Sequence, residues 1–197
     1  MLGLSAGYLF VNDQQTERRP DIQGLLWPEP KQLADFSLID QAGREFRFSN
    51  LLNKWSFIFF GYTNCPDICP ATLAILKEVN DMLEKTGGVS DVQTIFVTVD
   101  PERDSIQKLK EYTGYFNPDF TGLGGTEEQV SSLAGQIGIF HQKSQLNDSE
   151  NYLVDHTASI FLVDPKGRLI AIFSAPHQVE QILKSFRQIR SYLENSS

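Results

Sequence analysis

Alternation between apolar and polar side chains predicts two β-hairpins. Residues 36–40 and 44–48 alternate on either side of the sequence QAG, whose glycine suits a tight turn. Near the C-terminus, the sequence PKG joins residues 158–164 to residues 168–175, and both flanking segments are rich in branched and aromatic residues. The chain therefore carries one hairpin near the start of its regular structure and another near its end.

Helical periodicity predicts four helices. Pro70 opens the first of them, which closes at the glycine pair 87–88. Ser105 is positioned to cap a second helix that runs to about Phe116, and residues 126–139 form a third with two glutamates in its first turn. The apolar faces carry Leu73, Leu76, Val79 and Leu83 in the first helix and Val179, Ile182, Leu183, Phe186, Ile189 and Leu193 in the last.

Two further segments, residues 55–63 and 92–100, are almost continuously apolar, which is typical of strands buried on both faces of a sheet. Because a helix separates them, they predict a right-handed parallel crossover, to which the late hairpin adds antiparallel strands. The fold class is therefore α/β, with a mixed central sheet flanked by helices and an added N-terminal β-hairpin. In open α/β sheets, ligands bind outside the carboxyl ends of the strands.

Composition and charge exclude several classes of protein. The chain has 197 residues with 41% hydrophobic and 21% charged residues, which excludes a disordered chain and a polytopic membrane protein. Its formal charge of −8 argues against a nucleic-acid partner, because neutralising phosphates requires a surplus of basic residues. Two cysteines are too few for a multi-disulfide scaffold, and without an obvious exposed apolar stripe we expect a monomer.

The N-terminal region divides into three parts. Residues 1–11 carry no charge and are too few to span a membrane, so we interpret them as a remnant of an N-terminal membrane anchor or as a loose apolar arm. Residues 12–34, with several prolines and charged residues, are predicted to form a linker or an extended segment on the domain surface. The folded domain is expected to span residues 35–197.

The two cysteines carry the candidate chemistry. Cys65 and Cys69 lie where the first buried strand meets its helix, and thiols there face backbone N–H groups and the helix dipole, which stabilise a thiolate. The pair could be structural, could close a disulfide, or could offer two soft sulfur ligands to one metal ion. Two thiolates do not complete a structural zinc site, and they favour Cu(I); an added imidazole also suits Cu(II).

A histidine is the natural third ligand, and the chain has three. His156 lies just before a predicted buried strand, whereas His141 is in a polar stretch and His177, beside a proline, is expected to be exposed or to cap the last helix. We therefore rank His156 first as a candidate metal ligand. Its neighbour Asp155 could orient the imidazole ring or be a plain surface carboxylate.

Three blocks of the sequence resemble the Sco/SenC family of copper-delivery proteins. They are FGYTNCPDICPATL (60–73), VTVDPERD (97–104) and YLVDHTASIFLVDPKG (152–167), and they occur in the order found in the family. The resemblance covers the chain from about residue 30 to the C-terminus. One departure is Asn64, where many members carry a histidine that is not a copper ligand in the family.

The resemblance implies a thioredoxin-like fold and a copper site. One copper ion, as Cu(I) or Cu(II), would be held by Cys65, Cys69 and His156. The implied partners are an upstream copper donor and the subunit of cytochrome c oxidase that holds its dinuclear copper centre. The implied location is the periplasmic face of a bacterial inner membrane, or the mitochondrial intermembrane space in a eukaryote, with a single N-terminal helix as tether.

The main alternative is a thiol–disulfide oxidoreductase that keeps the cysteines of that copper centre reduced, in which Cys65 attacks and Cys69 resolves. Such an enzyme does not need His156, whereas a copper carrier does. A peroxidase related to the peroxiredoxins is disfavoured, because Tyr62 stands where that lineage has a threonine. A purely structural interaction module is ranked below all of these.

Acidic residues near the predicted site have two interpretations. Asp100, Glu102 and Asp104 could form an acidic docking rim, although the sequence Asp-Pro at 100–101 is also common in turns that lead into a helix. Asp67 could be an exposed carboxylate that faces a partner or a simple turn residue.

Overall fold

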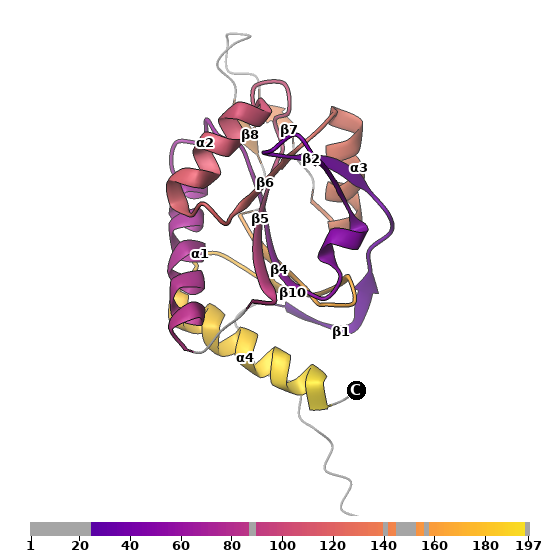
Figure 1. Ribbon diagram of the computed structural model, residues 1–197, viewed down its shortest axis with the longest axis vertical. Coiled ribbons are helices and arrows are strands. Elements are labelled where there is room, and N and C mark those ends of the chain that lie inside the picture. The colour runs from indigo at the N-terminus through magenta and orange to yellow at the C-terminus, as the bar shows by residue number, and fades with distance from the viewer. Residues whose placement is uncertain (1–24, 87–89, 140–141, 145–152, 156–157, 196–197) are drawn as a thin grey trace, which may run out of the picture.

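The computed structural model describes residues 25–86, 90–139, 142–144, 153–155 and 158–195 (Figure 1). The strands are β1 (Leu25–Gln32), β2 (Ser37–Asp40), β3 (Glu45–Arg47), β4 (Trp55–Gly61), β5 (Val92–Thr98), β6 (Thr121–Gly124), β7 (Gln142–Ser144), β8 (Leu153–Asp155), β9 (Ile160–Val163) and β10 (Arg168–Phe173). The helices are the 3₁₀ turn η1 (Phe48–Leu51) and the α-helices α1 (Ile68–Lys85), α2 (Ile106–Phe116), α3 (Glu127–Ile137) and α4 (Val179–Asn195).

Eight of the strands form one mixed sheet in the order β1-β10-β9-β4-β5-β6-β2-β3, and β7 and β8 form a separate two-stranded ribbon. The central strand β4 pairs in parallel with β5 and antiparallel with β9. The mixed sheet, the flanking helices and the added hairpin β2–β3 confirm the predicted α/β class. The predicted parallel crossover from β4 through α1 to β5 is also confirmed.

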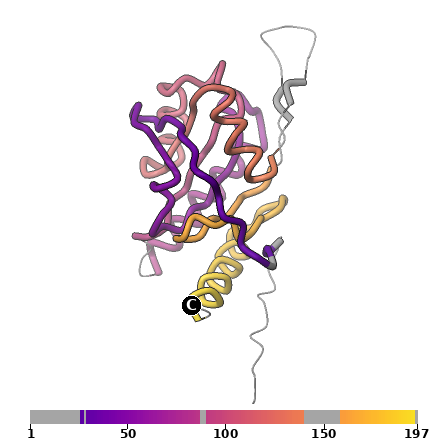
Figure 2. Tube along the Cα trace, turned by 90° about the vertical axis from the view of Figure 1, so that its right-hand side faces the viewer, coloured from indigo at the N-terminus to yellow at the C-terminus, as the bar shows by residue number. Residues whose placement is uncertain are grey.

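The helices cover both faces of this sheet. Figure 1 shows α1 and α2 on one side of the strands and α3 on the other. On the α1 side, the ring of Phe186 in α4 packs 5.3 Å from the ring of Phe57 and 5.4 Å from that of Trp55, measured between ring centroids. Figure 2 shows α4, in yellow, running along the lower end of the molecule. Every residue of β4 is buried, so this strand lies at the centre of the core.

The hairpin β2–β3 forms for local reasons that the sequence predicts. Gly43 adopts a φ of 77°, which favours glycine because a side chain there is strained. The buried carboxylate of Asp40 accepts hydrogen bonds from the backbone N–H groups of Ala42 and Arg44, at 2.8 and 2.9 Å, and pairs with the guanidinium of Arg44. These bonds close the turn and set the register of the two strands.

Two helix starts are fixed by side-chain caps. The hydroxyl of Ser105 accepts a hydrogen bond from the N–H of Lys108, as the sequence predicts. At the start of α3, Thr126 and Gln129 form a reciprocal capping box. By contrast, α1 begins at Ile68 and not at Pro70, so Cys69 already lies inside the helix.

Two strands of the main sheet escaped the sequence analysis. β1 contains Pro28 and Pro30, which cannot donate to a ladder; it lies at the sheet edge, and its register shifts between Leu26 and Lys31. β6 is only four residues long and includes two glycines. β1 also falls inside the segment predicted to be a linker or extended segment, residues 12–34, and its pairing with β10 makes its residues part of the sheet.

Within the described residues, no helix is both long enough and apolar enough to cross a bilayer. The predicted anchor remnant, residues 1–11, lies outside the described residues.

Candidate metal centre

The two cysteines meet at the carboxyl end of β4. Cys65 lies in the loop that follows this strand, and Cys69 is in the first turn of α1. The backbone N–H of Cys69 donates to Sγ of Cys65 across 3.4 Å. Neither residue is in a disulfide, and the side chain of Cys69 is fully buried whereas Cys65 keeps 9% of its surface exposed. The prediction that both cysteines lie where the first buried strand meets its helix is confirmed.

The two thiols are not equivalent. The pKa of Cys69 is raised far above its usual range, first by its hydrogen bond with the Cys65 thiol and second by burial, against a smaller opposing effect from the N–H of Tyr62. The expectation that the helix start favours a thiolate at both positions is therefore wrong for Cys69, because pairing and desolvation outweigh the nearby N–H groups. This shift favours the neutral thiol at Cys69, whose side chain is hydrogen-bonded to that of Cys65.

Gly61, the last residue of β4, allows this close packing. A Cβ at this position would lie 2.9 Å from Sγ of Cys69 and 2.8 Å from Cε2 of Phe96, both closer than van der Waals contact allows. Only a residue without a side chain lets the buried sulfur rest directly on the strand. The sequence analysis did not single out Gly61, and the signal would have been its position four residues before a cysteine.

Behind the cysteine loop lies the segment that follows β5. Asp100 and Asp104 are buried, with exposed fractions of 0% and 3%, whereas Glu102 is exposed. The interpretation of these three residues as an acidic docking rim is therefore wrong for both aspartates. Asp100 pairs with the guanidinium of Arg103, which also lies 5.7 Å from the centroid of the Tyr62 ring.

A tyrosine on α2 borders the same region. The hydroxyl of Tyr112 is buried and has no hydrogen-bond partner among the described residues. Its pKa is raised, mainly by burial and then by the negative charge that Cys69, Cys65 and Asp104 can carry nearby. Its ring packs against Phe96, at 5.4 Å between centroids. Nothing in the spacing of the sequence points to Tyr112, since it reaches the site only through the packing of α2.

The third predicted ligand, His156, and also His141, lie outside the described residues. The chain two residues after His156 is described: Ala158 leads into β9, whose first residue Ile160 pairs with Phe59 of β4. Because β4 and β9 are antiparallel, the start of β9 lies beside the carboxyl end of β4. Among the described residues, no group of three Cys, His, Asp or Glu side chains could hold a metal ion.

His177 is placed differently from what the sequence suggests. It is half-buried, and its Nε2 lies 3.0 Å from the carbonyl oxygen of Ala158, to which it donates. Burial lowers its pKa. Its Nδ1 is buried without a hydrogen-bond partner in the described part of the chain. His177 therefore anchors the segment that enters β9, in place of the exposed or capping role expected for it.

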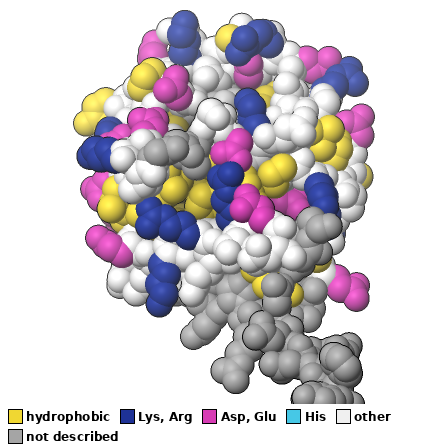
Figure 3. All heavy atoms as spheres, turned by 60° about the horizontal axis from the view of Figure 1, so that its bottom comes forward, with side chains coloured by type: hydrophobic (Ala, Val, Ile, Leu, Met, Phe, Trp, Pro, Cys, Tyr) yellow, Lys and Arg dark blue, Asp and Glu magenta, His cyan; other side chains and the backbone are white. Residues whose placement is uncertain are grey.

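The surface above the cysteines is formed by the loop itself. Asn64, Pro66, Asp67 and Ile68 are all exposed, and Asp67 precedes α1 without capping it through its side chain. The apolar side chain of Ile68 keeps 38% of its surface exposed between the two cysteines. On the separate face drawn in Figure 3, acidic and basic side chains are interspersed, so the surplus of negative charge forms no single patch there.

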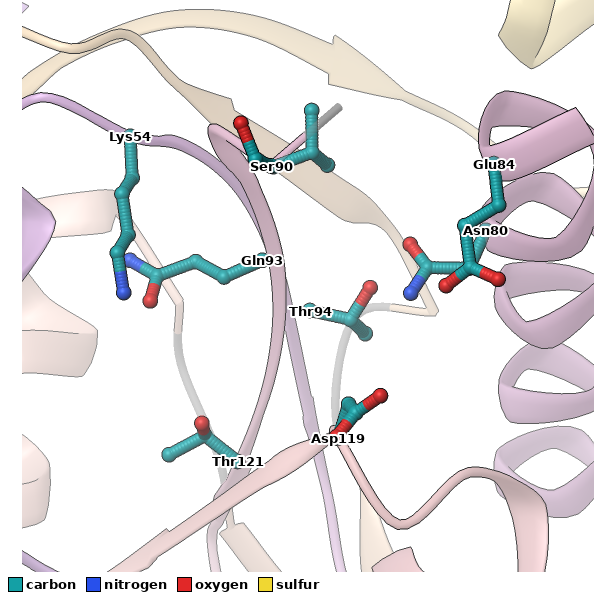
Figure 4. Close-up of a pocket in the computed structure, with 9 residues that line it drawn as sticks. Lys54, Asn80, Glu84, Ser90, Gln93, Thr94, Asp119 and Thr121 are labelled. Carbon is teal, nitrogen blue, oxygen red and sulfur yellow. The ribbon is translucent and has the colours of Figure 1, made fainter. Parts of the chain in front are cut away.

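A polar pocket of about 280 Å³ lies at the end of the sheet opposite the cysteines, where β5 and β6 begin (Figure 4). It is lined by the end of α1 and the starts of β5 and β6, including Glu84, Thr94 and Thr121. Glu84 is 15 residues from Cys69 along α1, which corresponds to about 22 Å of helix. This pocket is therefore separate from the cysteine pair.

Comparison with known proteins shows the family of the chain. The chain matches the family described as SCO1/SenC over residues 28–191. The chain belongs to this family. It is 37% identical over 159 residues to the mitochondrial protein SCO1 homolog 1 of Arabidopsis thaliana, and the match covers 79% of this chain and 47% of that protein. The chain thus spans about half the length of this relative.

Solved structures of the family share the fold. The copper-bound structure of ScoI from Arabidopsis thaliana has a TM-score of 0.75 at 36% identity, covering 81% of this chain and 98% of that one. The structure of apo Sco1 from Thermus thermophilus has a TM-score of 0.72 at 37% identity, covering 90% and 98%. The expected thioredoxin-like fold is confirmed by this likeness.

Proposed function

We propose that the protein is a copper carrier that binds one copper ion through Cys65, Cys69 and His156 and passes it to the dinuclear copper centre of cytochrome c oxidase. The observation that carries the proposal is the adjacency of the two thiols, with the N–H of Cys69 only 3.4 Å from Sγ of Cys65. The two thiol side chains are also hydrogen-bonded to each other, so both sulfur atoms can bind the same ion without rearranging the sheet beneath them.

The donor atoms suit copper better than the commoner metals. Thiolates are soft ligands that favour Cu(I), and a structural zinc ion takes four protein ligands, for which this chain has no further cysteine. His156 is proposed as the third ligand because the chain that follows it enters β9 at the edge where β4 ends. An imidazole added to two thiolates also accommodates Cu(II).

A site with three ligands also suits delivery. Copper is the cargo here, and a low coordination number leaves room for a sulfur atom of the recipient to bind before the donor sulfurs leave. Transfer by ligand exchange then releases no free metal ion. The exposed residues Pro66, Asp67 and Ile68 between the two cysteines offer the recipient a surface next to the metal.

The relatives support the cargo and the recipient. The family members of known structure include copper-bound proteins from Arabidopsis thaliana and yeast. A more distant one is described as a member of the Sco family of cytochrome c oxidase assembly proteins. Bacterial and mitochondrial relatives both occur. We accordingly propose that the protein works as a monomer on the periplasmic face of a bacterial inner membrane or in the mitochondrial intermembrane space, tethered through its N-terminus and loaded by an upstream donor.

The second candidate function, a thiol–disulfide oxidoreductase, is favoured by the difference between the thiols. Cys65, the more exposed, would attack a substrate disulfide and release one substrate thiol. Cys69 would then displace the second substrate thiol, leaving a Cys65–Cys69 disulfide and a substrate that has gained two electrons and two protons. That disulfide consumes both sulfur ligands, so the two functions exclude one another at any one moment.

Copper stoichiometry and visible absorption of the reduced protein test the proposal. We expect one copper per chain and, for Cu(II), a thiolate-to-copper absorption band. Both are expected to be lost in Cys65→Ser, Cys69→Ser and His156→Ala and kept in the control His141→Ala. Oxidation of the cysteine pair should also abolish copper binding. A wild-type protein that binds no copper but reduces a disulfide substrate through Cys65 would refute the carrier function in favour of the oxidoreductase.

A further inference from the structure

We propose that Asp104 is a positioning residue that fixes the cysteine loop in the geometry needed to bind copper. The proposal rests on the copper-carrier function above. Asp104 lies 39 positions after Cys65 in the sequence and is only 3% exposed. Its carboxylate accepts three hydrogen bonds, from the N–H of Thr63 at 2.9 Å, from the hydroxyl of Thr63 at 2.5 Å and from the hydroxyl of Thr98 at 2.6 Å.

Two of these three bonds hold the residue that leads into the cysteine loop. Thr63 stands two positions before Cys65, and both its backbone and its side chain are bound to the same carboxylate. The N–H of Cys65 then donates to the carbonyl of Tyr62 across 3.2 Å, which closes a turn over residues 62–65. With Thr63 fixed and the turn closed, the position of the Cys65 sulfur above the start of α1 is set.

Asp104 can do this because its own segment is tied to the sheet. The N–H of Val99 donates to the carbonyl of Gly61 at 2.8 Å, which joins the chain after β5 to the chain at the end of β4. The N–H of Asp104 donates to the carbonyl of Asp100, whose own N–H donates to the Thr98 hydroxyl. The loop after β5 is therefore a rigid support for the loop after β4.

A carboxylate is the side chain that this arrangement requires. All three partners donate hydrogen bonds, and an ionised carboxylate offers acceptor sites on both oxygens. An asparagine offers one acceptor oxygen and an amide NH2 group that is itself a donor and faces the same donors, so at least one of the three bonds is lost. Burying a carboxylate is costly unless it is well hydrogen-bonded, so the bonds from Thr63 and Thr98 are needed to keep Asp104 in the core.

A second buried aspartate serves as a matched control. Asp164 is 2% exposed and accepts hydrogen bonds from the N–H groups of Lys166 and Arg168 and from the Arg168 guanidinium, in the turn between β9 and β10. β9 begins beside the cysteines, next to the carboxyl end of β4, so the turn that follows β9 lies at the opposite end of the strands. Asp164→Asn therefore perturbs a comparable hydrogen-bond cluster far from the candidate site.

The experiment compares Asp104→Asn, Thr63→Val and Asp164→Asn in two assays. The first measures Cu(I) affinity by competition with a chromogenic chelator. The second needs no copper and measures the equilibrium between the cysteine pair and glutathione disulfide. In this reaction the cysteine pair is oxidised to a disulfide, and the two electrons and two protons that it loses reduce glutathione disulfide to two molecules of glutathione. Urea unfolding of each variant provides the stability against which both assays are compared.

We expect Asp104→Asn to weaken Cu(I) binding by about tenfold or more, as is usual when a residue that orients metal ligands is lost, and to shift the glutathione equilibrium constant. Thr63→Val keeps its N–H bond and should show a smaller change in the same direction. Asp164→Asn should lose stability but keep both wild-type constants. If Asp104→Asn and Asp164→Asn behave alike in both assays, the positioning role is refuted. If the wild-type protein binds no copper, the carrier function fails, and the glutathione assay alone decides the role of Asp104.

Discussion

Replacing Gly61 with alanine tests whether the buried sulfur of Cys69 depends on direct contact with β4. The added Cβ would lie 2.9 Å from that sulfur, 0.5 Å closer than the 3.4 Å at which ordinary contact begins. It would also meet Cε2 of Phe96 at 2.8 Å and Cε1 of Phe59 at 3.2 Å. These three neighbours are fully buried and surrounded by core, so none of them can move freely.

The magnitude follows from overpacking a dense core. Inserting one methyl group where neighbours cannot retreat costs about 1–3 kcal/mol, which corresponds to a fall in Tm of ~2–12 °C for a chain of this size. The displacement falls on a proposed metal ligand, so we also expect Cu(I) affinity to drop by about tenfold or more. Gly61→Ala should therefore lower both stability and affinity.

The assays are urea unfolding and chelator competition for Cu(I), with Gly114→Ala as the control. Gly114 is an exposed residue of α2, and a Cβ there would meet nothing within 4 Å. Alanine in an exposed helix is more stable than glycine by about 0.5–1 kcal/mol, so this variant should gain stability with unchanged affinity. A Gly61→Ala protein with wild-type stability and affinity would show that the close approach of strand and sulfur is unimportant.

Three further predictions follow from burial. Iodoacetamide should alkylate Cys65 well before Cys69, because Cys65 keeps 9% of its surface exposed whereas Cys69 is fully buried and has a raised pKa; equal labelling of both in a mass-spectrometric time course would contradict this asymmetry. His177 has a lowered pKa, so its contribution to stability is present above its unfolded value of about 6.5 and is lost as the pH falls through the folded value. His177→Gln should flatten unfolding free energy against pH in that window, and an unchanged slope would exclude His177 as its source. Phe186→Ala removes a buried ring packed on Trp55 and should cost ~3–5 kcal/mol in urea unfolding, whereas a loss under 1 kcal/mol would mean that α4 repacks.

The parts of the fold that the sequence predicts are those specified by local patterns. The continuous apolar run of β4, the helical spacing of Leu73, Leu76 and Val79, and the Ser105 cap each depend on residues close together in the chain, and all are confirmed. β1 escaped prediction because its prolines argue against a strand. β1 nevertheless forms, because it is an edge strand that pairs with β10 on one side only. Prolines, which have no N–H group to donate, are tolerated in such a strand.

The site divides in the same way. The meeting of Cys65 and Cys69 could be predicted because four residues at a strand–helix junction bring two side chains together. Asp104 and Tyr112 could not be predicted, because each reaches the cysteines only after β4 has paired with β5 and α2 has packed on the sheet. Gly61 had a signal in its position four residues before Cys65, but its close contact with the Cys69 sulfur arises only from the packing of α1 on β4. The sequence DPERD, with aspartates at 100 and 104, was a weak signal for a role near the site. The sequence analysis assigned these aspartates to a surface rim or a turn, although Asp104 is buried in the core.

The two neighbours of β4 in the sheet explain why the cysteines, Asp104 and the start of β9 lie at the same end of the strands. Its parallel neighbour β5 delivers the loop that holds Asp104, and its antiparallel neighbour β9 begins where the chain that follows His156 enters the sheet. The inner half of the site, with Cys69 and Asp104, is therefore fixed to a fully buried strand, while the outer half, from Pro66 to Ile68, faces solvent. A carrier needs both properties, because its ligands must be held well enough to bind the ion and exposed enough for a recipient to reach it. Since Cys65 joins the two halves, we expect ligand exchange in the proposed transfer to begin at Cys65.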